Sequence, residues 1–234
     1  MLTPKKKISK KEIKQDELLS AYVKASSFYY ENKRYVSYAI TGLVILVVAT
    51  LIFVNNRRAS NEKAATELGR IFPIYDAAQS NPLQLQQAID GQPDRGIMGL
   101  KTIVDNYGST ESGEIARFYL ANAYYNVSRY DDALRQFESF SSGNKLLEAS
   151  AQAGAAACHE AKGEFEKAAE GYEKAAGTVS SPLSTPENLN SAARCYGKAG
   201  QKDKAIVLLK RLKLDYPSSQ YARDADRYLS EFSA

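Results

Sequence analysis

The chain has 234 residues, a formal net charge of +4, two cysteines and one histidine. So few cysteines exclude a disulfide framework and a cysteine-based zinc site. With a single histidine and no glycine-rich phosphate loop, the sequence offers no catalytic set. We therefore expect a protein that is not an enzyme and that needs no cofactor, metal or small-molecule substrate.

Residues 1–34 are predicted to form a basic tail. They carry nine Lys or Arg against four Asp or Glu, whereas residues 55–234 carry 22 against 23. Two structures are compatible with this tail: a disordered basic segment, or a short amphipathic helix on a membrane surface. The apolar face of such a helix would hold Ile13, Leu18, Leu19, Tyr22, Val23 and Tyr29.

Residues 35–54 contain no charge and consist mainly of Ile, Leu, Val and Ala. At ~1.5 Å per residue, this run is long enough to cross a bilayer core of roughly 30 Å. Basic pairs at 33–34 and 57–58 bracket it, and tyrosines cluster at its first end as at a membrane interface. We predict a transmembrane helix rather than a buried soluble helix. A cleavable signal peptide is disfavoured because the run is long and no Ala-x-Ala site follows it.

The charge distribution predicts the orientation of this span. Positive residues are retained in the cytoplasm, so the tail, with a surplus of +5, is expected there. Residues 55–234, with a net charge of −1, are expected on the opposite side. Nucleic-acid binding by the lysine run is not expected beside a membrane span.

Residues 55–95 are predicted to contain a linking helix, about 55–79 and bent near Pro73, and the start of a degenerate helix pair. The second helix of that pair is expected at about 96–110. The reason is that the segment Gly99–Gly108 parallels Leu208–Pro217 further along the chain.

Three later stretches, at 129–134, 164–169 and 201–206, are versions of one pattern and recur at spacings of 35 and 37 residues. Each has a small residue before it and an aromatic or Leu four positions after a shared Ala. A purely helical period in the mid-thirties is typical of a helix-turn-helix solenoid. We predict an all-α fold with repeats at 96–234 (about 96–110, 114–147, 149–182 and 186–219), ending in a capping helix at 220–234.

Small and aromatic residues at helical spacing define the expected core of each repeat. Cys158 and Cys195 fall at the same position of successive first helices, and they are expected to be buried free thiols. His159 takes the place that Tyr124 and Tyr196 take in the other repeats, so we interpret it as a packing residue. The other core positions are Leu120, Ala121, Ala133, Phe137, Phe140, Ala155, Ala156, Ala168, Tyr172, Ala175, Ala192, Ala193, Ala205, Leu209 and Leu212.

This pattern resembles the tetratricopeptide repeat, with a small-small-Tyr first helix, a Gly-x-Tyr-x-x-Ala-x-x-x-Phe second helix and a final Pro. Departures are Ser128 for Gly, Phe140 and Leu212 for Ala, and the absence of Trp. The good matches are Tyr124, Tyr130, Ala133, Phe137, Gly163, Ala168, Tyr172, Ala175, Tyr196, Gly200, Ala205 and Pro217.

The resemblance implies a partner groove lined from four positions of each first helix. The clamp for a C-terminal carboxylate that chaperone-binding members use is matched only at Asn122, so a groove for an apolar helix or extended segment is expected instead. The implied groove residues are Ile115, Phe118, Asn122, Tyr125, Ser150, Ala153, Ala157, Glu160, Glu187, Asn190 and Arg194.

The complete layout is similar to that of bacterial single-pass tetratricopeptide proteins of the YfgM-like type, notably at 16–19, 31–33 and 99–108. That resemblance implies a non-enzymatic protein of the bacterial inner membrane with periplasmic repeats. It also implies protein partners at the Sec translocon and among periplasmic chaperones. A structural scaffold for envelope assembly or cell division remains the alternative.

Overall fold

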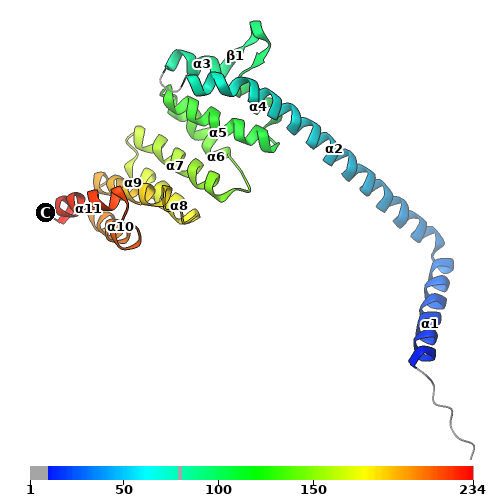
Figure 1. Ribbon diagram of the computed structural model, residues 1–234. Helices are drawn as coiled ribbons and strands as arrows, with labels where there is room; N and C mark the ends of the chain where they lie inside the picture. The colour runs from blue at the N-terminus through cyan, green and yellow to red at the C-terminus, as the bar shows by residue number, and fades with distance from the viewer. Residues whose placement is uncertain (1–9, 79–80, 234) are drawn as a thin grey trace, which may run out of the picture. The chain divides into compact units, whose positions relative to one another are not determined.

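A computed structural model describes residues 10–78 and 81–233, which form an all-α chain with one small hairpin (Figure 1). The chain divides into two compact units, Met1–Asn56 and Arg57–Ala234. The elements are α1 (Lys10–Glu31), α2 (Lys33–Ala77), α3 (Pro82–Asp90), β1 (Gly91–Gln92), η1 (Pro93–Arg95), β2 (Ile97–Met98), α4 (Leu100–Tyr107), α5 (Glu111–Asn126), α6 (Tyr130–Ser139), α7 (Lys145–Ala161), α8 (Phe165–Thr178), α9 (Ser184–Lys198), α10 (Lys202–Asp215) and α11 (Gln220–Ser233).

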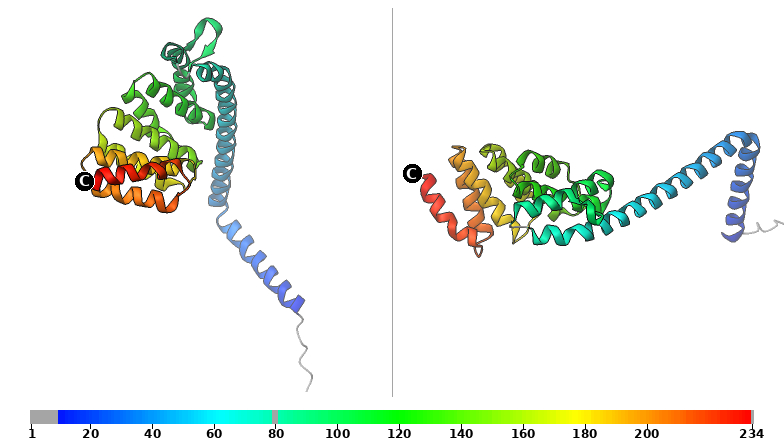
Figure 2. Two further views of the ribbon diagram at one scale, coloured as in Figure 1. Left: turned by 60° about the vertical axis from the view of Figure 1, so that its left-hand side comes forward. Right: turned by 90° about the horizontal axis from the view of Figure 1, so that it is seen from above.

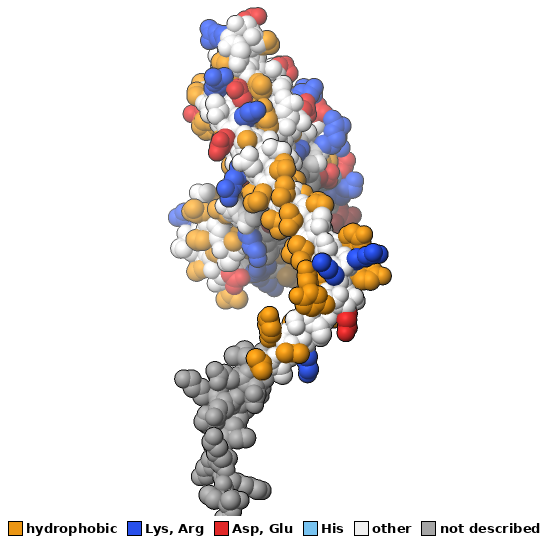
Figure 3. All heavy atoms as spheres, turned by 90° about the vertical axis from the view of Figure 1, so that its right-hand side faces the viewer, with side chains coloured by type: hydrophobic (Ala, Val, Ile, Leu, Met, Phe, Trp, Pro, Cys, Tyr) orange, Lys and Arg blue, Asp and Glu red, His pale blue; other side chains and the backbone are white. Residues whose placement is uncertain are grey.

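The first unit contains α1 and the apolar part of α2. By length and composition, α2 is able to cross a membrane, and none of its most apolar stretch is buried. The large apolar side chains from Ile40 to Val54 are all exposed. Figure 3 shows hydrophobic side chains on the surface of these helices.

The second unit is a stack of helix pairs: α5 with α6, α7 with α8, and α9 with α10, followed by α11 (Figure 2). Here α5, α7 and α9 are called the first helices, and α6, α8 and α10 the second helices. Each pair packs on the next through the contacts of α6 with α7 and of α8 with α9, and α11 covers α10 and α9. The predicted order of repeats and capping helix is therefore that of the structure.

One turn geometry joins the two helices of every pair. Ser128, Gly163 and Gly200 occupy the left-handed region, with φ of 62°, 77° and 77°. The next residue donates its backbone N–H to the carbonyl five positions earlier in all three turns, as in Arg129 to Tyr124 (2.8 Å). This is the Schellman ending of a helix. The three sequence stretches are thus one structural unit repeated.

Ser128→Gly is expected to stabilise the second unit by about 1 kcal/mol, because a residue with a Cβ is strained in the left-handed region. Gly163→Ser is the matched reverse change and should destabilise by a similar amount. Urea unfolding of residues 57–234, followed by circular dichroism, measures both. A loss of stability in Ser128→Gly would show that the Ser128 side chain supports the turn.

The start of the second unit differs from the predicted pairing. The helix expected at 55–79 is the end of α2, which runs unbroken from Lys33 through Pro73 to Ala77. Its side chains reach α5: the Tyr75 and Tyr119 rings are 5.1 Å apart. The helix α4 packs mainly on α5 and to a smaller extent on α3, which the sequence analysis did not assign. The pairing of the 55–79 helix with α4 is therefore corrected.

A short hairpin connects α3 to α4. Its strands β1 and β2 pair antiparallel, with Gly91 opposite Met98 and Gln92 opposite Ile97. Gly91 has φ of 88°, and a Cβ there would overlap the backbone of β2 and Gly99. The close approach of two backbone segments explains why glycine is needed at this position.

The core positions predicted for the repeats are buried, with three exceptions. Phe140 lies one residue past the end of α6 rather than on it, and it is partly exposed. His159 and Ala155 are also partly exposed. The equivalents of His159 on the other first helices, Tyr124 and Tyr196, are 5% and 3% exposed. The middle repeat is therefore packed less tightly at this position than its neighbours.

Candidate partner-binding groove

The predicted groove residues lie on the accessible side of the three first helices, and none of them is buried. Glu187 is exposed and the others are partly exposed. Between them along α5 lie the fully packed side chains of Leu120 and Ala121. Each first helix therefore has one face in the core and one face available to a partner.

The α5 end of this surface is aromatic and held in place by its neighbours. The Phe118 ring lies 6.0 Å from the Phe137 ring and 5.6 Å from the Phe140 ring. The Tyr125 ring lies 5.5 Å from that of Tyr130. The Phe118 ring is thus shared between the accessible surface and the core.

The middle of the surface is formed by small side chains and has few free polar groups. Ala153 and Ala157 on α7 pack partly against the core of the last two repeats. The Ser150 hydroxyl donates to the Leu146 carbonyl (2.9 Å), and the Asn122 amide donates to the Phe118 carbonyl (2.8 Å). Because these donors are used within their own helices, the middle offers mainly van der Waals contact.

The far end of the surface is an ion-pair cluster centred on Glu160. Its carboxylate accepts from Arg194 (3.0 Å) and Lys198 (3.4 Å) of α9 and from the Tyr172 hydroxyl (3.3 Å) of α8. Burial and then the Glu160 carboxylate raise the pKa of Tyr172. Two cations facing one carboxylate leave this end with a net positive charge.

Two predicted residues from successive first helices meet at this cluster. Glu160 and Arg194 form a direct ion pair. Burial raises the pKa of Tyr125 on α5. Asn190, on the same face of α9 as Arg194, has a buried side-chain oxygen without a hydrogen-bond partner.

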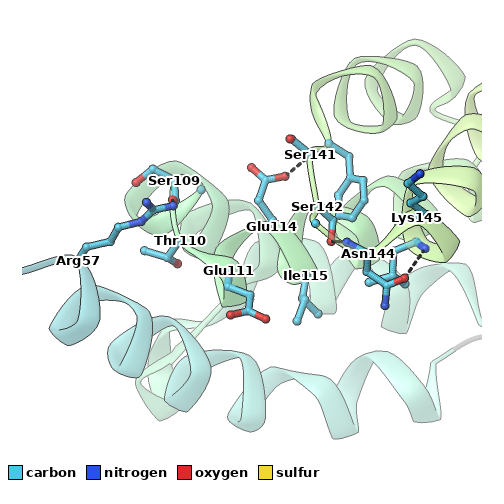
Figure 4. Close-up of a pocket in the computed structure, with 14 residues that line it drawn as sticks. Arg57, Ser109, Thr110, Glu111, Glu114, Ile115, Ser141, Ser142, Asn144 and Lys145 are labelled. Atoms are coloured by element: carbon cyan, nitrogen blue, oxygen red, sulfur yellow. Dashed lines mark hydrogen bonds between the residues drawn. The ribbon is translucent and has the colours of Figure 1, made fainter. Parts of the chain in front are cut away.

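A cleft of about 1080 Å³ lies where the N-terminal ends of α5 and α7 face the loop after α6 (Figure 4). Arg57 closes one side by donating to the Ser109 carbonyl (3.3 Å). Glu114 accepts the backbone N–H of Ser141 (3.0 Å). The cleft includes Ile115 and so adjoins the predicted groove. Sequence reasoning missed it because it is built from three helix ends and a loop that no repeat pattern describes.

His159 belongs to a second hollow, of about 600 Å³, between α6 and α8 with α7 as its floor. Its Nδ1 lies 2.8 Å from the Glu164 carboxylate. Hydrogen bonds from Lys167 and His159 lower the pKa of Glu164 to about 2. The histidine therefore joins a surface ion-pair cluster, whereas packing alone was expected.

Cys158 and Cys195 are free and buried, as the repeat position predicts. Burial raises the pKa of Cys158 to about 11 and that of Cys195 to about 12. At neutral pH both groups are uncharged thiols. Among the described residues, no group of three or more His, Cys, Asp or Glu is placed to hold a metal ion.

We expect neither thiol to react with Ellman's reagent at pH 8 in the folded protein, because the reactive species is the thiolate and both sulfurs are inaccessible. Both should react promptly in denaturant. The folded pKa values lie above the usual thiol value of 9.0, so burying the neutral thiols stabilises the fold below pH 9. That stabilisation is lost as the pH rises through about 11 for Cys158 and about 12 for Cys195. Rapid labelling of the folded chain would contradict the assigned packing.

Residues 191–219 match the family described as Tetratricopeptide repeat. Two solved structures of kinesin light chain nearly identical TPR-like repeats from Podosopora anserina are similar to this chain. One, a variant form, has a TM-score of 0.57 at 18% identity and covers 72% of this chain and 85% of its own. The chain folds as a tetratricopeptide-type helical solenoid. The other has a TM-score of 0.55 at 18% identity and covers 72% of this chain and 86% of its own.

No curated protein matches the chain. The match to the repeat family lies in the last repeat, which contains α9, α10 and the turn at Pro217. Solenoids of this fold typically serve as non-enzymatic protein-interaction modules. The likeness to the solved structures establishes the fold of the second unit.

Proposed function

We propose that this protein is a membrane-anchored interaction module that binds protein partners in the groove of its first helices. The observation that carries the proposal is the line of accessible residues from Phe118 through Tyr125 and Glu160 to Arg194, spread over three successive helix pairs. Its aromatic end, small middle and positive end suit an extended segment with apolar residues followed by an acidic group.

The anchoring part of the proposal rests on the exposed apolar stretch of α2. A helix of this composition in a soluble protein is normally buried, and here the apolar stretch has no protein cover among the described residues. The basic residues before it favour a cytoplasmic N-terminus, and so a periplasmic groove. The similarity in layout to YfgM-like proteins supports the Sec translocon and periplasmic chaperones as partners.

The groove is tested by changing Phe118 and Tyr125 together to Ala in the full chain and recovering partners in mild detergent. We expect loss of most of the partner, because aromatic anchors contribute strongly to interfaces. The matched control is Val207→Ala with Leu214→Ala, two apolar side chains on α10 that are 64% and 81% exposed. Unchanged recovery in the groove variant, with folding verified by melting, would refute the groove.

Partner identity and topology are tested together by a photo-cross-linker at Ile45 and by protease added outside the inner membrane. Translocon subunits in the cross-links would support the proposed partners. Division or wall-synthesis proteins would support the scaffold alternative. Protease should digest the repeats and spare the first 34 residues. Protection of the repeats would reverse the orientation.

A further inference from the structure

The helix α1 carries a broad apolar surface over its second half. Nine of the thirteen residues from 19 to 31 fall outside a narrow polar stripe formed by Ser20, Lys24, Ser27 and Glu31. That stripe recurs at spacings of four, three and four residues, which keeps it on one side of a helix. The large side chains outside it are exposed: Leu19, Tyr22, Val23, Phe28, Tyr29 and Tyr30, by 65%, 72%, 57%, 61%, 42% and 76%.

The polar atoms on this part of α1 are compatible with an apolar surrounding. The Ser26 hydroxyl, outside the stripe, donates to the Val23 carbonyl (3.0 Å). The Ser27 hydroxyl donates to the Lys24 carbonyl (3.0 Å). Because both serine hydroxyls are satisfied within the helix, contact with a medium of low polarity leaves neither of these two donors unpaired.

The surface adjoins the start of the apolar helix. Only Asn32 separates α1 from α2, and backbone bonds from Asn32 to Phe28 and from Val36 to Asn32 (both 3.0 Å) continue across it. Exposed Tyr29, Tyr30, Tyr35 and Tyr38 surround this junction. Tyrosine is enriched where a bilayer meets water, because its ring is apolar and its hydroxyl is polar.

Two features favour a lipid surface over a second copy of the helix. A two-stranded coiled coil has a narrow apolar seam, whereas here only one narrow stripe is polar. Lys24, Lys33 and Arg34 flank the apolar surface, and the preceding residues 5–7 and 10–11 are all lysine. Such a cluster beside a span is attracted to anionic headgroups.

We propose that α1 lies in the headgroup region of an anionic leaflet, with the polar stripe towards water and the rest of residues 19–31 in contact with lipid. This inference rests on the proposed membrane anchoring. It adds a lipid-binding surface that the repeat groove does not involve.

The test uses the full chain in nanodiscs containing phosphatidylglycerol, with a fluorescent label on Tyr22→Cys, Lys24→Cys or Ile45→Cys. The two native thiols are buried, and the unchanged chain measures any background labelling. Tyr22→Cys samples the lipid-facing side, Lys24→Cys the polar stripe, and Ile45→Cys the span. Iodide in water and nitroxides on lipid headgroups are the quenchers.

We expect iodide to quench the label at position 22 several-fold less than the label at 24, and the headgroup nitroxide to show the reverse order. Replacing phosphatidylglycerol with phosphatidylcholine should raise iodide quenching at 22 at least about two-fold. Equal iodide quenching at 22 and 24, with position 45 shielded, would overturn the proposal while leaving the anchoring intact. Iodide access at 45 would overturn both.

Two further outcomes count against the proposal. A label at 22 that is shielded from both quenchers, together with disulfide-linked dimers of Tyr22→Cys at low protein density, would show that a second copy covers α1. Shielding at 22 that is the same in phosphatidylcholine would overturn the role assigned to anionic lipid.

Discussion

Phe137→Ala is expected to lower the free energy of unfolding of residues 57–234 by about 3–5 kcal/mol, as a large truncation in a core does. Phe137 is 4% exposed and packs against the Phe118 ring. On α7, Gly154 lies so close that a Cβ there would overlap the Phe137 ring. Because Gly154 has no side chain, it cannot fill the cavity that the truncation leaves. Urea unfolding followed by circular dichroism measures the loss.

Phe118→Ala is the matched comparison on the facing helix. Its ring is partly exposed, so its removal should cost about 1–2 kcal/mol, near the value of the lost ring contacts. Partner recovery should fall in Phe118→Ala at temperatures where the domain stays folded. A loss as large as that of Phe137→Ala would mean that Phe118 belongs to the core and not to the groove.

The repeats were predictable because one local pattern specifies both helices and the turn between them. The small residue at 128, 163 and 200 sets the left-handed turn, and the apolar spacing that follows sets the buried face. Phe140 departed from the pattern because α6 ends at Ser139. A Ser-Ser-Gly-Asn loop follows, and its Asn144 accepts the first N–H groups of α7.

The region before the repeats was not predictable in the same way. The segment at 82–98 forms the short helix α3 and a hairpin with a two-residue ladder. The helix α3 is placed by its contacts with α4 and α5 rather than by a repeat period. Likewise, the Glu160 cluster joins residues separated by 34 and 38 positions. The charged residues are evident in the sequence. Which of them pair could be told only once the packing of α7 against α9 was known.

The composition of the groove has a consequence for specificity. Its aromatic end is preorganised by ring contacts, so little side-chain entropy is lost when a partner binds there. At the other end, Arg194 and Lys198 are both already paired with Glu160, so an acidic partner group must compete with that carboxylate for them. Apolar contacts should therefore dominate the affinity, and charge should tune which segments are accepted.

Gly113→Ala is expected to destabilise residues 57–234 by about 1–3 kcal/mol, the usual cost of overpacking. Gly113 is buried in the first turn of α5, where its N–H donates to the Thr110 hydroxyl (3.1 Å). A Cβ there would overlap the carbonyl of Tyr107 at the end of α4. Since the obstacle is backbone, α4 and α5 must separate, and the cleft that includes Thr110 must change shape.

Gly177→Ala is the matched control because it makes the same change in a helix without the obstacle. No atom lies within 4 Å of a Cβ added at Gly177. Alanine is favoured over glycine in helices, so this variant should gain about 0.5–1 kcal/mol. If Gly113→Ala destabilises the protein and Gly177→Ala stabilises it, the loss is due to the close approach of α4 and α5 and not to helix propensity. A gain of stability in both variants would show that the turn between α4 and α5 can move without cost. The cleft beside it would then have no fixed shape for a partner to recognise.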